Sequence, residues 1–299
     1  MCPEGALTSL IRLLPMVLNL TRRTLFRSAV SAAGLLQVTS AQTSQPKPKK
    51  AATADDVPGA ELKRKLTVVF VGAHVDDYTV CSGTIARYTS AGHRVLLYSF
   101  TPGDSRSMAD MNGLPIEELA ANRRADALRG AKILGAELRF LDQHNQNMQV
   151  NPDVCIAFNK LLAAEKPAVV FGMWPLEFHP DHRAAANISY NAWLQSGMAF
   201  RYLFCETPGG GEMTTQHFHP TRYVDVESVM DQKRAAHAAN RYIKKGIPEA
   251  DLLARFRGME YGCQYAEGFV ELTTVAKMPP ENITPRRWYY GGLRSHHDY

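Results

Sequence analysis

Two short motifs gather histidine and aspartate side chains: residues 74–77 (His-Val-Asp-Asp) and residues 179–182 (His-Pro-Asp-His). Two imidazoles and one carboxylate can hold a zinc-like cation and leave a fourth position for water. Such a cation lowers the pKa of the bound water toward 7, so that hydroxide forms at neutral pH. A second carboxylate and a third imidazole would then be available as general base and oxyanion partner. The two motifs therefore indicate hydrolysis at a metal.

The same side chains also have a purely structural interpretation, because Asp and other short polar residues often cap helices. Asp77 or Thr79 could cap a helix that starts near Cys81, and Asp181 could cap a helix that starts at His182. Either motif alone favours capping. Both motifs together favour a site, provided that the fold brings them to one place.

The order of elements predicts such a place. Apolar and β-branched runs predict strands, and the segments between them have helical patterns. The predicted strands are residues 66–72, 94–101, 137–141, 168–172, 200–206 and 222–226. The predicted helices are residues 81–91, 116–135, 152–165, 182–196, 230–245 and 249–261. This alternation predicts an α/β, Rossmann-like three-layer fold with a mostly parallel sheet and helices on both faces.

Ligands of open α/β sheets bind outside the carboxyl ends of the strands. The loops that follow the first four predicted strands meet at that edge, and almost every one carries His or Asp. They contain residues 73–77, residues 102–104, Asp142 with His144, and residues 174–182. The topology thus brings the two motifs together at the edge that binds ligands.

An ordered set of further motifs gives the sequence a family resemblance. These are residues 82–86 (Ser-Gly-Thr-Ile-Ala), 101–104 (Thr-Pro-Gly-Asp), 123–135, 179–185, and 257–258 with 265–269. Together with residues 73–77, they resemble the PIG-L/LmbE-like zinc-dependent N-deacetylases, which remove acyl groups from amino-sugar conjugates. The resemblance runs from Lys65 to about Leu272.

The resemblance implies roles for individual residues. His74, Asp77 and His182 would bind Zn²⁺ or another divalent metal. Asp76 would be the general base that deprotonates the water and then returns the proton to the leaving amine. Protonated His179 would stabilise the oxyanion. The remaining implied positions are Asp181, which would orient a histidine, and Arg123 and Asp104, which would face the substrate.

The sequence departs from the family pattern at four positions. Val75 stands where the family usually has Pro, Tyr78 where it has Glu, Asp126 where Glu is frequent, and Asn240 where His is common. Tyr78 could reshape the pocket floor or contribute a hydroxyl. Arg123 has the alternative role of a surface salt bridge. These departures leave the implied ligands and base in place and put the substrate in doubt.

The sequence thus predicts a hydrolase that removes an N-acyl group, with acetyl expected, from a small-molecule or glycoconjugate amino sugar. One alternative is hydrolysis of another amide or an ester at the same site. A second is a non-catalytic carbohydrate-binding protein, against which the intact Asp76 argues, because binding alone needs no base.

The charge distribution bears on location and partners. The 299 residues carry a formal net charge of +5, yet residues 66–299 hold 24 basic and 25 acidic side chains. Arg22 and Arg23 precede a modest apolar run, residues 28–38, and small residues 39–41. This order resembles a twin-arginine export signal, with an incidental cytosolic helix as the alternative. The apolar run is shorter than the ~20 residues of a membrane span.

We therefore expect an export signal at residues 1–41, a tether at residues 42–65 and a deacetylase domain at residues 66–299. The mature protein would be periplasmic or secreted, without an integral membrane span. Its near-neutral body predicts no nucleic-acid partner. The sequence leaves open the oligomeric state and the pairing of the cysteines that remain after export, which are Cys81, Cys155, Cys205 and Cys263.

Three smaller features complete the expectations. The glycine run 209–211 is interpreted as a flexible loop that could cover the site. His217 and His219 could form a second metal site, although solvated loop histidines are commoner. The aromatic tail, residues 288–290, is expected to pack against the domain rather than to stack on a sugar or nucleic acid.

Overall fold

A computed structural model of the chain describes residues 57–207 and 217–273, without the side chains of residues 244 and 245. The expectations for the export signal, the glycine run and the aromatic tail fall outside the described residues. No helix in the described ranges combines the length and apolar character of a membrane-crossing helix.

One seven-stranded sheet forms the centre of the described part, with strand order β3-β2-β1-β4-β5-β7-β6. The first five strands in this order are mutually parallel, and β7 runs antiparallel to both of its neighbours. The strands are β1 (Thr67–Gly72), β2 (Arg94–Ser99), β3 (Glu137–Phe140), β4 (Val169–Gly172), β5 (Arg201–Cys205), β6 (Arg222–Asp225) and β7 (Ala266–Glu271). In register, Val69 of β1 lies between Leu96 of β2 and Val170 of β4.

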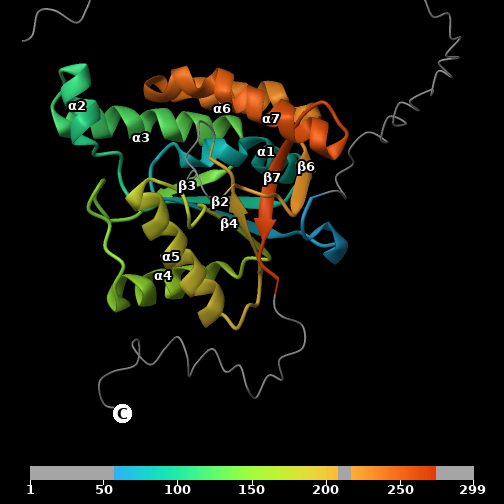
Figure 1. The fold of residues 1–299 in the computed structure, drawn as a ribbon. Coiled ribbons are helices and arrows are strands. Elements are labelled where there is room, and N and C mark those ends of the chain that lie inside the picture. The colour runs from blue at the N-terminus through green and yellow to red at the C-terminus, as the bar shows by residue number, and fades with distance from the viewer. Residues whose placement is uncertain (1–56, 208–216, 274–299) are drawn as a thin grey trace, which may run out of the picture. The chain divides into compact units, whose positions relative to one another are not determined.

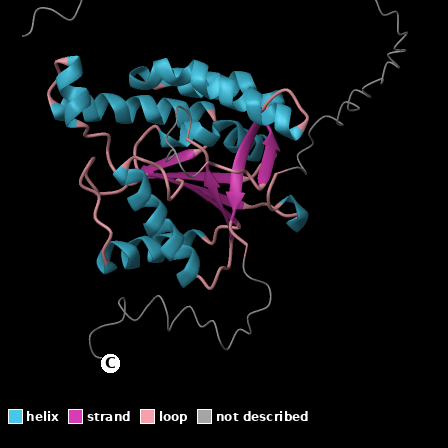
Figure 2. Ribbon diagram, in the orientation of Figure 1, coloured by secondary structure: helices cyan, strands magenta, loops and turns pink. Residues whose placement is uncertain are grey.

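Helices cover both faces of the sheet, with α4 and α5 on one side and α1, α3, α6 and α7 on the other (Figures 1 and 2). The α-helices are α1 (Ser82–Ser90), α2 (Arg106–Asn112), α3 (Ile116–Ile133), α4 (Pro152–Glu165), α5 (Pro180–Gln195), α6 (Met230–Ala239) and α7 (Ile247–Tyr261). Short 3₁₀ helices are η2 (Ala60–Leu62), η3 (Asp77–Cys81), η4 (Glu227–Val229) and η5 (Arg241–Gly246). The α/β three-layer fold with a mostly parallel sheet is confirmed.

Local sequence explains where these elements form. The side chains of Val68, Val69 and Val71 in β1 are fully buried, as a continuous apolar run in a parallel sheet requires. Helix α4 begins where the Asn151 side chain accepts a hydrogen bond from Val154 N and Pro152 occupies the first turn.

The folded body begins earlier than the sequence suggests. Residues 57–65 were expected to belong to the tether, but Val57 is buried in the core and η2 follows it. The Tyr88 hydroxyl donates a hydrogen bond to Pro58 O over 2.6 Å. These two contacts attach the segment to the core and to α1. The sequence pattern does not reveal them, because only one valine side chain and one backbone carbonyl of a mostly polar segment are involved.

The topology places the carboxyl ends of β1 and β4 side by side. Strand order changes direction there, because β2 and β3 continue from one side of β1 whereas β4 and β5 continue from the other. Such a switch point opens a crevice between the loops that leave the two strands. Both His/Asp motifs lie in those loops.

Candidate active site

The turn after β1 is held by Asp77. Its Oδ2 accepts hydrogen bonds from Ala73 N over 2.7 Å and from His74 N over 2.8 Å. Asp77, the first residue of η3, thereby holds the backbone that leaves β1. Because Oδ2 already has two donors, Oδ1 is the Asp77 oxygen left for a ligand.

Three donor atoms face one another at this point. His74 Nδ1 lies 3.0 Å from His182 Nε2, and Asp77 Oδ1 lies 3.5 Å from the former and 3.3 Å from the latter. Tetrahedral ligands at 2.0–2.1 Å from a zinc ion stand about 3.3 Å apart. The three atoms, which we call the triad, therefore fit one cation. They come from the turn after β1, the first residue of η3 and the first turn of α5.

A wider group of three imidazoles includes His179. Nitrogen atoms of His74, His179 and His182 lie within 4.8 Å of one another. The donor atoms of the triad lie closer together, at 3.0–3.5 Å, and the Asp77 carboxylate adds a negative charge that a third imidazole would lack. The geometry accordingly favours Asp77 over His179 as the third ligand.

Each triad histidine has a carboxylate on its other ring nitrogen. His74 Nε2 lies 3.2 Å from Asp181 Oδ2, and His182 Nδ1 lies 2.7 Å from Glu177 Oε2. Such carboxylates fix the tautomer and orientation of metal-binding imidazoles. The sequence implied this position for Asp181, whereas Glu177 was missed, although it stands two residues before the second motif.

Electrostatics at the triad favour positive charge. Burial alone would lower the pKa of His74, but the Asp77 and Asp181 carboxylates outweigh burial and raise it to about 9. Burial likewise opposes protonation of His182, yet Asp77 and Glu177 raise its pKa to about 10. Burial would raise the pKa of Asp77, and the two imidazoles instead hold it well below its ordinary value. A cation at the triad would replace these protons.

His179 ends the loop and starts α5. Its Nδ1 accepts a hydrogen bond from Asp181 N over 3.2 Å, so the ring hydrogen of the neutral form is on Nε2. Burial, with the neighbouring imidazoles of His74 and His182, lowers the pKa of His179. The neutral form of the ring thus has an Nε2–H to donate, whereas the resemblance implies a protonated ring.

Asp76 and Arg123 form a buried pair beside the triad. Arg123 Nη2 donates to both carboxylate oxygens of Asp76 over 3.1 Å, and Nη1 donates to Gly103 O over 3.1 Å. Arg123 is 5% exposed, so its alternative role as a surface salt bridge is wrong. From α3 the guanidinium fixes the position of the Asp76 carboxylate.

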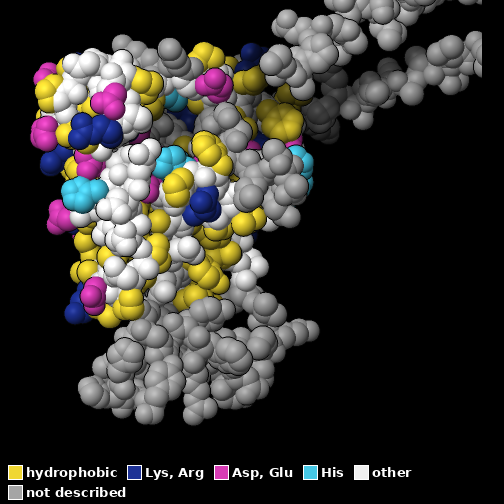
Figure 3. All heavy atoms as spheres, turned by 60° about the vertical axis from the view of Figure 1, so that its left-hand side comes forward, with side chains coloured by type: hydrophobic (Ala, Val, Ile, Leu, Met, Phe, Trp, Pro, Cys, Tyr) yellow, Lys and Arg dark blue, Asp and Glu magenta, His cyan; other side chains and the backbone are white. Residues whose placement is uncertain are grey.

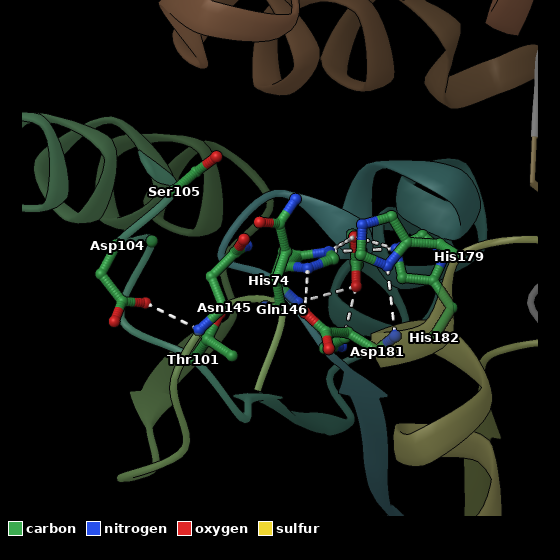
Figure 4. A network of polar contacts seen from close by, with 12 residues as sticks. His74, Thr101, Asp104, Ser105, Asn145, Gln146, His179, Asp181 and His182 are labelled. Atoms are coloured by element: carbon green, nitrogen blue, oxygen red, sulfur yellow. Dashed lines mark hydrogen bonds and ion pairs between the residues drawn. The ribbon is translucent and has the colours of Figure 1, made fainter. Parts of the chain in front are cut away.

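Asp104 is not brought to the triad. Its carboxylate lies 2.8 Å from His144 Nδ1 and accepts from Asn145 N over 3.1 Å. Figure 4 shows Asp104 apart from the group formed by the histidines and Asp181. The link to the site is indirect, since the next amide, Gln146 N, donates to Asp181 over 2.6 Å.

The structure does not support the capping interpretation. Neither η3 nor α1 has a side-chain cap, and the Thr79 hydroxyl donates to Asp76 O instead. Helix α5 is capped by His179 rather than Asp181. The motif carboxylates are therefore directed to the histidines and Arg123.

The departures at residues 78 and 240 contact each other. Asn240 Nδ2 donates to the Tyr78 hydroxyl over 3.0 Å, and this hydroxyl donates to Ala127 O over 3.1 Å. Tyr78 is buried between α3 and α6. Its hydroxyl thus serves the packing of two helices, which explains how a phenol is accommodated next to Asp77.

A pocket of about 350 Å³ opens beside the triad, within the range of small-molecule sites. One wall carries Asp76, Asp77 and His182, and the other carries residues from the C-terminal third, among them His237 and Glu249. His217 and His219 are exposed, with ring centroids 6.3 Å apart.

Comparison with known proteins finds similarity to deacetylases. Residues 69–193 match the family model PIG-L, which is described as GlcNAc-PI de-N-acetylase. A curated relative, the diacetylchitobiose deacetylase of Thermococcus kodakarensis, is 27% identical over 219 residues, which cover 67% of this chain and 81% of the relative.

Solved structures share the fold. The N,N'-diacetylchitobiose deacetylase of Pyrococcus horikoshii superposes with a TM-score of 0.59 at 23% identity, covering 71% of this chain and 85% of that one. GalB, the 4-carboxy-2-hydroxymuconate hydratase of Pseudomonas putida KT2440, superposes with a TM-score of 0.63 at 19% identity, covering 72% and 99%. Proteins named for two different reactions thus share this architecture, so the reaction must be argued from the site.

Proposed function

We propose that this protein is a metal-dependent N-deacetylase of the PIG-L family that removes an acetyl group from an amino-sugar conjugate. The observation that carries the proposal is the triad of His74 Nδ1, His182 Nε2 and Asp77 Oδ1, with Asp76 beside it. The family match over residues 69–193 and the deacetylase relative support the same reaction.

The triad residues would hold Zn²⁺ or another divalent cation. When bound, such a cation supplies an activated water near neutral pH and polarises the amide carbonyl. Asp77 can give only Oδ1 without breaking the β1 turn, so the protein offers three donor atoms and leaves room for water and substrate.

Asp76 would take the proton from the attacking water and return it to the leaving amine. Arg123 binds both Asp76 oxygens from one side, which fixes the orientation of the carboxylate at the pocket. His179 would donate its Nε2–H to the oxyanion that forms at the amide carbon. These roles use a neutral His179 in place of the protonated one that the resemblance implies.

The test is release of acetate and a free amine from N-acetylglucosamine and N,N'-diacetylchitobiose. Asp76→Asn should lower kcat by about 10²–10⁴-fold, because it removes the general base. Elemental analysis should show that the variant still retains metal. Full turnover in Asp76→Asn would contradict this mechanism, and preferential cleavage of simple esters would favour the alternative hydrolase.

We also propose export of the chain through the twin-arginine-type segment at residues 22–41. The order of basic, apolar and small residues supports this proposal. N-terminal sequencing of the protein from a periplasmic or secreted fraction tests it. A mature chain that retains Arg22 would contradict export by this signal.

A further inference from the structure

The pocket wall opposite the triad comes from a different part of the chain. His237 lies in the last turn of α6, Gly246 ends η5, and Glu249 lies in the first turn of α7. All three line the same pocket as Asp76 and His182. None of them belongs to the two motifs or to the proposed catalytic steps.

A small gap separates two polar groups on this wall. A Cβ added to Gly246 would stand 3.6 Å from Glu249 Oε2 and 3.7 Å from His237 Nε2. Glycine therefore leaves a space about the size of one methyl or hydroxyl group between a carboxylate and an imidazole. Gly246 has φ −81°, so the backbone does not require glycine there.

His237 is suited to bind a neutral hydroxyl. It is 7% exposed, and the charged groups around it are Lys233, Asp76 and Asp251, with a backbone hydrogen bond at Ile243. Burial first, and then Lys233, lower the pKa of His237, so the imidazole is neutral at pH 7. A neutral imidazole that lines a pocket can exchange a hydrogen bond with a hydroxyl.

The charge of the lining restricts the substrate. Among the described side chains that line the pocket, Asp76, Asp77 and Glu249 are acidic, and none is Lys or Arg. Asp76 is neutralised by Arg123, and Asp77 lies against two imidazoles. Glu249 is exposed and lines the same pocket, where its carboxylate would repel an anionic substituent of the reacting sugar.

We propose that the gap between His237 and Glu249 binds a hydroxyl of an uncharged sugar ring whose acetamido group lies at the triad, and that Glu249 excludes phosphorylated or carboxylated conjugates. This inference rests on the proposed deacetylase function and narrows its substrates to neutral amino sugars. It assigns His237 and Gly246 to substrate binding and Glu249 to specificity.

The first experiment measures kcat and KM of the metal-loaded enzyme on N,N'-diacetylchitobiose. His237→Ala removes the hydrogen bond and Gly246→Ala fills the gap without changing charge. Each should raise KM about 5–10-fold with kcat within about twofold, because one neutral hydrogen bond is worth at most about tenfold in affinity. His237→Gln retains polar atoms and should recover most of the loss.

Asp231→Asn is the matched control on the same helix, because Asp231 is fully exposed on α6 and is not among the residues that line the pocket. Its kinetic constants should equal those of the wild type. Unchanged KM in both His237→Ala and Gly246→Ala would overturn the subsite, and so would a loss in kcat alone.

The second experiment compares N-acetylglucosamine with N-acetylglucosamine 6-phosphate. The wild type should show at least tenfold lower kcat/KM for the phosphate, and Glu249→Lys should reduce that ratio about tenfold or more. The ratio should also shrink as salt is raised, because charges near the surface are screened. A preference for the phosphate, or an unchanged ratio in Glu249→Lys, would overturn the specificity role.

Failure of the subsite and failure of the deacetylase function give different results. Acetate release by the wild type together with unchanged variants would contradict the subsite and leave the proposed function standing. If the wild type released acetate from neither sugar, the deacetylase proposal itself would fail, and the subsite with it.

Discussion

At the scale of single residues, each triad side chain directs one atom toward the proposed metal position and uses another atom to contact the rest of the protein. Asp77 binds the β1 turn through Oδ2, His74 contacts Asp181 through Nε2, and His182 contacts Glu177 through Nδ1. The side chains are thus oriented before any ligand arrives, which lowers the cost of binding.

Glu177→Gln should weaken metal binding without removing a ligand. The carboxylate on His182 Nδ1 increases the basicity of the opposite nitrogen, and loss of such a partner typically reduces metal affinity 10–100-fold. Titration of the metal-free protein with Zn²⁺ against a competing chelator measures this change.

Glu165→Gln is the matched control, because Glu165 is an acid paired with Arg94 and Arg139 at the end of α4. It should leave the Zn²⁺ affinity unchanged. Equal affinities for Glu177→Gln and the wild type would show that the contact with His182 is only structural.

The positions of both motifs at predicted strand ends predict that they meet, whereas the family resemblance implies which of their residues bind the metal, act as base or orient a histidine. Neither points to Glu177, because a glutamate in a loop is normally solvated, and only the fold reveals that this one is 1% exposed. The pairing of Asp76 with Arg123 likewise depends on how α3 crosses the sheet edge, which no local pattern encodes.

At the scale of elements, η3 packs between α3 and α6 through Tyr78. Its hydroxyl lies so close to Gly130 that an added Cβ would clash with it, and Ala236 O lies 3.0 Å from the same position. Gly130 is therefore required by packing rather than by backbone conformation.

Gly130→Ala should destabilise the protein by about 1–3 kcal/mol, although alanine favours an isolated helix by about 1 kcal/mol. Tyr78→Phe removes the clashing oxygen and costs about 1–2 kcal/mol for its lost hydrogen bonds. In urea denaturation, the double variant should lose less than the sum of the single variants. Strict additivity would contradict the contact.

A carboxylate links α3 to η5. Asp126 Oδ2 accepts from the backbone N of Arg241 over 3.0 Å and from its Nε over 2.9 Å, and Arg129 also pairs with it. Burial would raise the pKa of Asp126, but these donors hold it below the ordinary 3.8. The ionised form is therefore the one that the fold stabilises.

Asp126→Asn should lower the free energy of unfolding by about 1–2 kcal/mol at pH 7. Because the folded pKa is lowered, the stabilisation is complete above the unfolded pKa of about 3.8 and is lost as pH falls through the folded value. The stabilities of variant and wild type should thus stay apart from pH 7 down to about pH 4 and begin to converge only below it. Exposed Asp110, changed to Asn, is the control and should show no such convergence.

Most elements could be predicted from periodicity, and the misses have physical causes. Strand β7 (Ala266–Glu271) is not an apolar run, because buried Glu267 is satisfied by Lys233 Nζ and by the amides of Gly83 and Thr84. The helix expected at residues 81–91 begins as η3, since Asp77 ties its first residues to β1. Helix α2 is short and only Ala109 is buried, which gives little periodic signal.

At the scale of the whole molecule, the described body carries no excess of one charge on the face seen in Figure 3, where basic and acidic side chains are interspersed. This agrees with a small-molecule substrate rather than a polyanion. The basic excess of the sequence lies in residues 1–65.

Deletion of residues 1–41 should leave kcat/KM and the free energy of unfolding unchanged, because the described core begins at Val57. Deletion of residues 1–62 should cost about 2 kcal/mol or more, since it removes buried Val57, the Pro58 carbonyl that Tyr88 binds, and Glu61 beside Arg201. Equal stability of the two deletions would contradict the boundary at residue 57.

The two walls of the pocket also differ in when the ribosome makes them. Residues 74–77 and 177–182 emerge well before residues 237–249, and the latter begin more than fifty residues after the second motif. A nascent chain could therefore assemble the metal ligands while the pocket still lacks its opposite wall. Capture of a cation would then precede the ability to choose a substrate.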